Sequence, residues 1–255
     1  MQLTFTAMPY RTFDLTEAAD YLHLTGSELA QLVKTTDIPH EHRGERIVFV
    51  RMELDAWASQ RILGLPPKRL ADYHQQTTRG TRSFFHEDTL IPELLHPDFI
   101  AAAMASKTKK SVIRDLVALA EKTGQVLDPA DLLASVEARE GLCPTALPGG
   151  LALLHCRNYQ PYRFEGSFIV VGRTVQEIHF GAPDGRPTWL FFLICCQDER
   201  IHLHALARLC LAVHKTDVVA RLLAAPDAAA MYAALLAAEQ TVLSGKKSAD
   251  ATAPG

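Results

Sequence analysis

The chain has 255 residues, of which 48% are hydrophobic and 22% are charged, and its formal net charge is -3. This composition excludes disorder as a description of the whole chain, and the length allows one large domain or two smaller ones, each with its own core. Because the chain has no overall basic field, any contact with nucleic acid must come from a local patch.

The apolar runs and the cysteines of the chain bear on its compartment and on metal binding. Met1–Tyr10 lacks the basic start and apolar run of a secretory signal, and the longest apolar run lies within Trp189–Cys196. A membrane-spanning helix needs about 20 apolar residues. The five cysteines show no spacing typical of a disulfide framework or a paired metal site. We therefore expect a cytoplasmic protein with no membrane segment, no metal and no cofactor.

Residues 13–65 carry the pattern of a small domain. A short helix is predicted over Leu15–Leu22, and Thr25 with Glu28 forms a capping box that begins a second helix. The stretch Ile38–Val50 reads as a hairpin, and Met52–Leu63 as a closing helix. Helix, turn, helix, basic hairpin and helix is the layout of a winged helix-turn-helix.

The opening Leu15-Thr16-Glu17-Ala18-Ala19-Asp20-Tyr21-Leu22 resembles that of the excisionase/MerR-type DNA-binding modules. That resemblance implies that the second helix enters the major groove and that the hairpin acts as the wing. The candidate DNA contacts are Ser27, Gln31, Lys34, Arg43 and Arg46, with His42 and Arg51 nearby. Acidic residues share the segment, and one such module binds weakly, so a homodimer or a partner is needed. The open alternative is a fold reused for protein contact or for sensing a small molecule.

After Pro66-Pro67 the chain is polar, and residues 66–88 are predicted as a linker that can be partly helical. From residue 89 to 243 helices alternate with buried strands, which indicates an α/β layered domain. The expected strands are Leu151–Leu154, Phe168–Val171 and Trp189–Cys196, and the expected later helices are Leu203–Val213, Asp217–Leu223 and Asp227–Leu243. The tail, residues 244–255, is predicted to be disordered.

Ordered motifs in this second domain resemble a known family. They are Arg139-Glu140, Thr145, the segment Gly149-Gly150-Leu151-Ala152-Leu153-Leu154-His155, the turn Asp184-Gly185-Arg186-Pro187, and His202-Leu203. Together they are similar to the fructose/mannitol-class enzyme IIA domains of the bacterial phosphotransferase system, including the nitrogen-regulatory branch. The resemblance implies a mixed β-sheet flanked by helices, with His155 as the phosphorylated histidine and His202 as the second active-site histidine.

The residues support this chemistry independently. Histidine is a nucleophile near neutral pH, and a histidine that ends a buried strand is held at the sheet edge where ligands of α/β sheets bind. His202 opens a helix, whose free N–H groups attract anions, and it should face inward whereas His204 lies with Arg208 on another face. Thr145 and Arg157 could supply a hydroxyl donor and a positive charge.

Two departures from the family pattern leave alternatives open. Leu154 stands where the family has Pro before the histidine, and Pro148 interrupts a glycine-rich turn. The first hypothesis is a regulator that accepts a phosphoryl group on His155 from a histidine phosphocarrier protein and passes the signal to DNA binding or to a partner. The others are a IIA-fold sensor that is never phosphorylated, and a sugar-transport IIA component.

Overall fold

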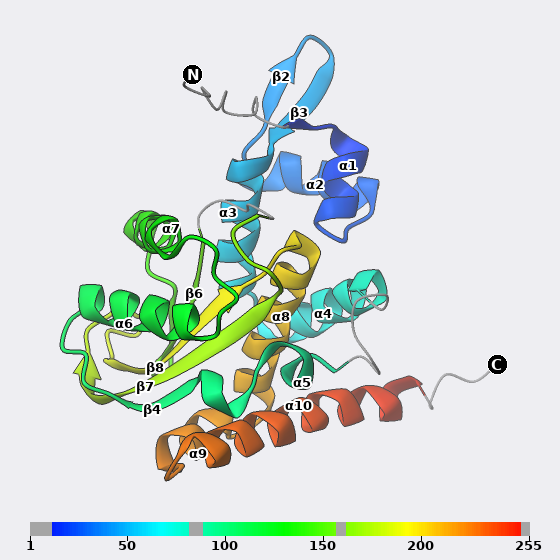
Figure 1. Ribbon diagram of the computed structural model, residues 1–255. Coiled ribbons are helices and arrows are strands. Elements are labelled where there is room, and N and C mark those ends of the chain that lie inside the picture. Colours follow the sequence, from blue (N-terminus) through cyan, green and yellow to red (C-terminus); the bar gives the residue numbers. More distant parts are fainter. Residues whose placement is uncertain (1–11, 82–88, 157–161, 251–255) are drawn as a thin grey trace, which may run out of the picture. The chain divides into compact units, whose positions relative to one another are not determined.

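The computed structural model describes residues 12–81, 89–156 and 162–250. These residues fold as two compact units that divide after Arg61 (Figure 1). Within the described ranges, no helix combines the length and the apolar character needed to cross a bilayer.

The N-terminal unit is a small helical domain with a hairpin. Its elements are β1 (Thr12–Phe13), α1 (Leu15–Tyr21), α2 (Gly26–Thr35), β2 (Glu41–Arg43), β3 (Arg46–Val50) and α3 (Arg51–Leu63). The predicted capping box is confirmed, because Glu28 N donates to Thr25 Oγ1 at 3.2 Å and Thr25 N donates to Glu28 Oε2 at 2.7 Å. Leu29, Phe49 and Leu54 are fully buried and form the centre of its core.

The C-terminal unit is a mixed α/β domain. Its elements are α4 (Pro67–Thr81), α5 (Ile91–Leu94), the 3-10 helix η2 (Pro97–Phe99), β4 (Ile100–Met104), α6 (Lys109–Lys122), α7 (Pro129–Leu142), β5 (Ala146–Leu147), β6 (Leu151–His155), β7 (Phe168–Ile178), β8 (Thr188–Cys195), α8 (Glu199–Lys215), α9 (Val218–Ala224) and α10 (Ala228–Asp250). The sheet has the order β4-β7-β8-β6-β5. β6 is parallel to β8 and β4 is parallel to β7, whereas β7–β8 and β5–β6 are antiparallel.

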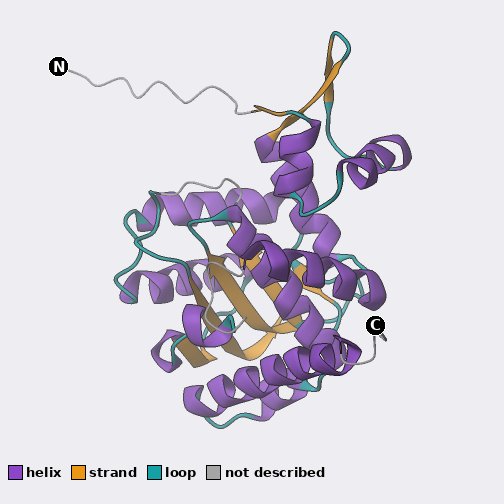
Figure 2. Ribbon diagram, turned by 90° about the vertical axis from the view of Figure 1, so that its right-hand side faces the viewer, coloured by secondary structure: helices purple, strands orange, loops and turns teal. Residues whose placement is uncertain are grey.

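Helices cover both faces of this sheet, as Figure 2 shows. Alternation along the buried strand β6 decides what each face meets. Ala152 and Leu154 join the core formed with α6 and α7. Leu151 and Leu153 point the other way, toward side chains of α8, α9 and α10. His155, two residues after Leu153, therefore leaves the sheet on the face that α8 covers.

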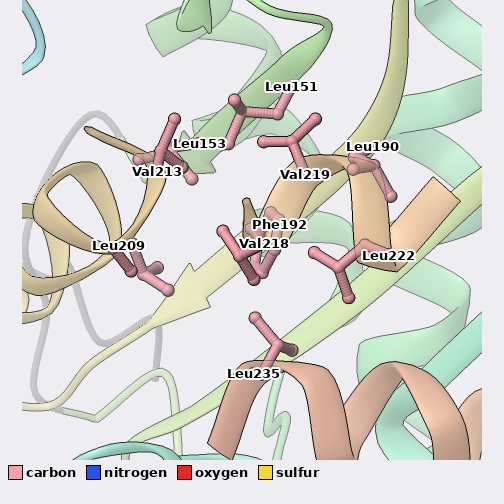
Figure 3. A pocket seen from close by; sticks show the side chains of 11 residues that line it. Leu151, Leu153, Leu190, Phe192, Leu209, Val213, Val218, Val219, Leu222 and Leu235 are labelled. Carbon is pink, nitrogen blue, oxygen red and sulfur yellow. The ribbon is translucent and has the colours of Figure 1, made fainter. Parts of the chain in front are cut away.

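A small gap remains in the core on that second face (Figure 3). It measures about 10 Å³ and is lined only by apolar side chains, among them Leu151, Leu153 and Phe192 from the sheet and Leu209 from α8. A cavity needs roughly 10–15 Å³ and two or more polar partners to hold one water molecule. The gap is therefore a packing defect and no ligand site.

The strand predictions need two corrections. β7 continues from Val171 to Ile178 although its outer half is polar, because the antiparallel partner β8 extends that far and Ile178 pairs with Thr188. β4 was not predicted, since Ala101–Ala103 is a sequence that favours helix; it pairs in parallel with β7. In both cases pairing with a neighbouring strand, rather than the local sequence preference, makes the segment a strand.

The predicted linker is also corrected. Residues 67–81 form α4, which packs along α8 in the most extensive helix–helix contact among the described residues. The positions that α4 buries are Leu70, His74, Thr77 and Thr78, which have helical spacing but are mostly polar. A search for an apolar period therefore misses this stripe. Residues 82–88, the rest of the predicted linker, lie outside the described residues.

The predicted disordered tail begins too early. α10 continues through residue 244 and ends at Asp250, so the helix occupies about half of the stretch assigned to disorder. Alanine, lysine and serine in this stretch are compatible with a helix that is already nucleated by its packed N-terminal part. Residues 251–255 lie outside the described residues.

Candidate functional site

His155 is the last residue of β6 and is only 2% exposed. Its Nδ1 lies 2.9 Å from the backbone oxygen of Leu153, and its Nε2 accepts a hydrogen bond from Arg139 Nε at 3.1 Å. A guanidinium cannot accept a hydrogen bond, so Nε2 must carry the lone pair and Nδ1 the proton, which it donates to Leu153. The imidazole is thus held in one tautomer with Nε2 as its nucleophilic atom.

His202 lies beside His155. It sits near the start of α8, is 6% exposed, and its ring centroid is 4.8 Å from that of His155, with the two planes inclined by 51°. The helix begins at Asp198, whose side chain accepts from Arg200 N, and whose backbone oxygen accepts from His202 N. The expectation that His202, and not His204, faces His155 agrees with this geometry.

Arg139 brings a positive charge to the pair. It comes from α7, is 2% exposed, and donates Nη1 to the backbone oxygen of Cys143 at 3.1 Å. Its Nη2 is buried and has no hydrogen-bond partner within the described residues. No carboxylate of those residues forms an ion pair with it, since the neighbouring Glu140 is engaged elsewhere. A buried cation without an anion is costly unless an anion arrives.

Both histidines are neutral at physiological pH. Burial, then His202, then Arg139 hold the pKa of His155 well below its ordinary value. Burial, with a further contribution from Arg139, lowers the pKa of His202 to about 3. The site therefore presents two uncharged imidazoles and one guanidinium, and it carries a net positive charge that an anionic group would balance.

Thr145 is close to this site but does not act as expected. It is fully buried, and its hydroxyl donates to Glu140 Oε2 at 2.7 Å while its N–H donates to Glu140 Oε1 at 3.0 Å. Glu140 also forms an ion pair with Lys109 Nζ at 3.0 Å. The single hydroxyl proton of Thr145 is thus already used. Its place in the structure is to anchor the turn after α7, and the prediction of a free hydroxyl donor needs this correction.

The other predicted positions fall outside this cluster. Arg157, the predicted source of positive charge, lies outside the described residues. Among the described residues, Arg139 of the pair Arg139-Glu140 brings the positive charge next to His155. The sequence signal that could indicate the role of Arg139 is the position of this charged pair on a helix that also carries the buried Leu132 and Val136.

The glycine-rich turn before β6 is closed by backbone contacts. Gly149 N donates to Asp184 Oδ2 at 3.2 Å, and the backbone oxygen of Gly150 accepts from Trp189 N and Leu190 N. Both glycines have positive φ, 96° and 89°, a region that other residues rarely adopt. The turn thus ties the start of β6 to the start of β8, and it sets the register that places His155 opposite Ile194.

Comparison with known proteins identifies the family of the domain that contains this cluster. Residues 93–238 match the family described as "Phosphoenolpyruvate-dependent sugar phosphotransferase system, EIIA 2". The chain belongs to the EIIA 2 family. The matched region contains β4 to β8 and the whole His155–His202–Arg139 cluster, and it leaves α4 and the N-terminal unit outside.

Relatives of the EIIA domain include a nitrogen regulatory protein and a fructose-specific component of the phosphotransferase system. A nitrogen regulatory protein of Bradyrhizobium diazoefficiens is 32% identical over 148 residues, which cover 57% of this chain and 94% of that protein. The fructose-specific EIIABC component of Bacillus subtilis is 28% identical over 53% of this chain but only 21% of its own length. The crystal structure of nitrogen regulatory protein IIA-Ntr from Neisseria meningitidis matches with a TM-score of 0.53 and 27% identity, over 58% of this chain and 99% of that one.

The predicted DNA contacts belong to the N-terminal unit. Ser27, Gln31 and Lys34 are exposed on α2, and Arg43 and Arg46 are exposed on the β2–β3 hairpin. Arg43 is paired with Glu41 through Nη2 and Oε2 at 3.1 Å. Exposure makes these side chains available to a ligand, and the acidic neighbour reduces the positive charge that the hairpin presents.

Proposed function

We propose that this chain is a phosphorelay regulator in which His155 accepts a phosphoryl group from the phosphohistidine of a phosphocarrier protein. The observation that carries the proposal is the cluster around His155: a neutral imidazole with a fixed tautomer, next to a buried guanidinium that has no carboxylate partner among the described residues. Family membership supports the same reading, and the nitrogen regulatory relatives favour regulation over transport.

The chemistry follows from the atoms present. The Nε2 lone pair of His155 attacks phosphorus, the nitrogen–phosphorus bond of the donor breaks, and its electron pair returns to the donor imidazole. No proton has to leave Nε2, because the proton of His155 is on Nδ1, where Leu153 O accepts it. Arg139, whose Nε is released from Nε2 and whose Nη2 is unoccupied, can then donate to phosphoryl oxygens.

The output would come from the added charge. A phosphoryl group brings about two negative charges. We expect these charges to change contacts with a partner or with the N-terminal unit. For that unit we propose a winged helix-turn-helix that binds DNA, with α2 in the major groove and the β2–β3 hairpin as the wing. The order of its elements and the exposed basic side chains support this, and a homodimer remains a prediction.

The first experiment is phosphoryl transfer. The purified chain is incubated with labelled phosphoenolpyruvate, the general phosphotransferase enzyme and the phosphocarrier protein of its own organism. We expect an acid-labile, alkali-stable label that is lost completely in His155→Ala. The matched control is His214→Ala, an exposed histidine of α8 that lies far along the helix from the site. No label from active donors would leave a sensor that is never phosphorylated, a reading that the near-complete burial of His155 and His202 favours.

The second experiment tests the N-terminal unit. Genomic fragments bound by the full chain are selected, and their affinity is measured against salt concentration. We expect Lys34→Ala and Arg46→Ala each to weaken binding and to lower the salt slope by about one. Lys68→Ala, an exposed lysine of α4, is the control. Equal recovery of fragments by the wild type and the Lys34→Ala/Arg46→Ala double variant would argue for a protein-binding or sensing module.

A further inference from the structure

Helix α4 is an addition to the EIIA domain. The family match begins at residue 93, whereas α4 ends at Thr81. Only residues 64–66 separate α4 from the end of α3 at Leu63, so α4 is the covalent connection between the N-terminal unit and the EIIA domain. α4 thus lies outside the matched domain and yet packs against its helix α8.

The contact between α4 and α8 is held by a buried polar network (the α4 network: His74, Thr77, His204, Arg208 and Glu239). Arg208 donates Nε to His74 Nε2 at 2.6 Å and Nη1 to Glu239 Oε1 at 2.7 Å. His204 lies between Thr77 Oγ1, 2.9 Å from its Nδ1, and Arg208 Nη2, 3.4 Å from its Nε2. Both imidazoles accept from the guanidinium, so both are neutral, and Glu239 balances the one cation.

The α4 network also reaches the start of the EIIA domain. Glu239 accepts from Leu90 N at 2.8 Å and from Ile91 N at 3.0 Å, which joins α10 to the first residues of α5. Each member is at most 4% exposed. Because it consists of hydrogen bonds that water can replace once α4 leaves, such a contact can release and re-form more readily than an apolar one of equal area.

The direction of α4 places this network behind the candidate site. His74 contacts Arg208 and Thr77 contacts His204, so α4 runs antiparallel to α8 and its C-terminal end points toward the first turn of α8. His202 and His204 are two residues apart, about 200° around the helix axis. His202 faces His155, and His204 faces α4. The first turns of α8 therefore lie between α4 and His155.

The site itself is closed. His155 is 2% exposed and His202 is 6% exposed, although a phosphohistidine of another protein would have to reach His155 Nε2. We propose that α4 is a latch: docked on α8, it holds the first turns of α8 against His155, and its release lets α8 move and opens the acceptor nitrogen. A ligand of the N-terminal unit that pulls on α4 would then control access to His155, and phosphorylation would in turn favour release of α4.

The latch is tested by loosening α4 without changing the EIIA domain. Thr77→Val keeps the shape of the side chain and removes its hydrogen bonds with His204 Nδ1 and with the backbone oxygen of His74. Gln75→Ala, exposed on the same helix, is the matched control. Hydrogen exchange measures the release of α4. Diethyl pyrocarbonate, which acylates neutral imidazoles, measures access to His155 by peptide mass spectrometry. The readout needs no phosphoryl transfer.

We expect Thr77→Val to increase both the exchange of the α4 amides and the acylation rate of His155 by about fivefold or more, as the loss of these two hydrogen bonds predicts. Gln75→Ala should match the wild type. Leu70→Ala, at a fully buried position of α4, is a second way to loosen the helix. Faster exchange of the α4 amides with an unchanged acylation rate of His155 would overturn the latch. So would an exchange rate of the α4 amides that neither variant increases.

This proposal rests on the proposed function only in treating His155 as the acceptor, and the two can fail separately. If the variants raise both acylation and labelling by the phosphocarrier protein, both proposals stand. If acylation rises but neither wild type nor variant takes up label, the latch stands and the phosphorelay falls. If label forms at the same rate in all variants and acylation is unchanged, the relay stands and the latch is wrong.

Discussion

Two buried clusters of the same kind lie on opposite sides of α8. They differ in whether a carboxylate of the described residues pairs with the arginine. In each, an arginine donates Nε to the Nε2 atom of a histidine and a second imidazole lies nearby: Arg139 with His155 and His202, and Arg208 with His74 and His204. Arg208 also pairs with Glu239. Arg139 has no carboxylate partner within the described residues, and its Nη2 is unoccupied.

The presence or absence of a carboxylate partner distinguishes a cluster that holds helices together from one that can bind an anion. Where the charges balance, the cluster is complete and serves to hold helices together. Where a buried cation lacks an anion, the protein keeps an electrostatic cost that only a ligand can relieve, and a phosphoryl group has the charge and the acceptor oxygens to do so. The same residue types therefore indicate different roles, and the carboxylate decides between them.

The largest expected effect comes from breaking the balanced cluster. Arg208→Met removes the cation and leaves the buried Glu239 with the N–H groups of Leu90 and Ile91 as its partners among the described residues. We expect a loss of about 3–5 kcal/mol in the free energy of unfolding, as for other broken buried pairs. Denaturant unfolding measures it. A change below about 1 kcal/mol would show that the α4 network contributes little to stability.

The matched substitution at the site should change the stability little and the rate of phosphoryl transfer strongly. Arg139→Met removes a cation that no carboxylate of the described residues pairs with, so the free energy of unfolding should change by less than about 1.5 kcal/mol. Loss of one electrostatic stabiliser should lower the rate of phosphoryl transfer to His155 by about 100–1000-fold. Rates near those of the wild type would mean that another cation, such as Arg157, supplies the charge.

A smaller effect should appear with pH. His202, with its pKa lowered to about 3, binds no proton in the folded state between pH 6.5 and 3, whereas the unfolded chain does. Stability is therefore unaffected above pH 6.5 and falls as pH decreases below it, by about 1.4 kcal/mol per pH unit for each such histidine. Unfolding of the wild type and of His202→Gln at pH 7.5, 6.5 and 5.5 should converge toward lower pH. Parallel pH profiles would contradict a depressed pKa.

The smallest effect of a substitution on phosphoryl transfer is expected at Thr145. Because its hydroxyl donates to Glu140, Thr145→Val should lower the free energy of unfolding by about 1–3 kcal/mol, the cost of an unsatisfied buried group. The rate of phosphoryl transfer should change by less than about tenfold, below the effect expected for a group that contacts the phosphoryl oxygens. A larger fall in rate with little loss of stability would restore the first interpretation of Thr145 as a donor.

Much of this protein follows from the sequence alone. Local signals predicted the capped helix after Thr25, the hairpin and the central strands, because caps, turns and apolar runs act over a few residues. The ordered motifs predicted the EIIA family and the pair His155 and His202, because strand and helix positions hold both residues in one arrangement. These features depend on short stretches of chain or on their order.

The tertiary structure decided what depends on distant partners. β4 is a strand because β7 pairs with it, and α4 packs on the EIIA domain because its polar stripe meets Arg208 and His204, more than 120 residues away in the chain. Likewise, Glu140 accepts a hydrogen bond from the Thr145 hydroxyl and pairs with Lys109, while Arg139 is the buried cation beside His155. Hydrogen bonds between buried polar groups are specific to the pair that meets, so no pattern along the chain could assign them.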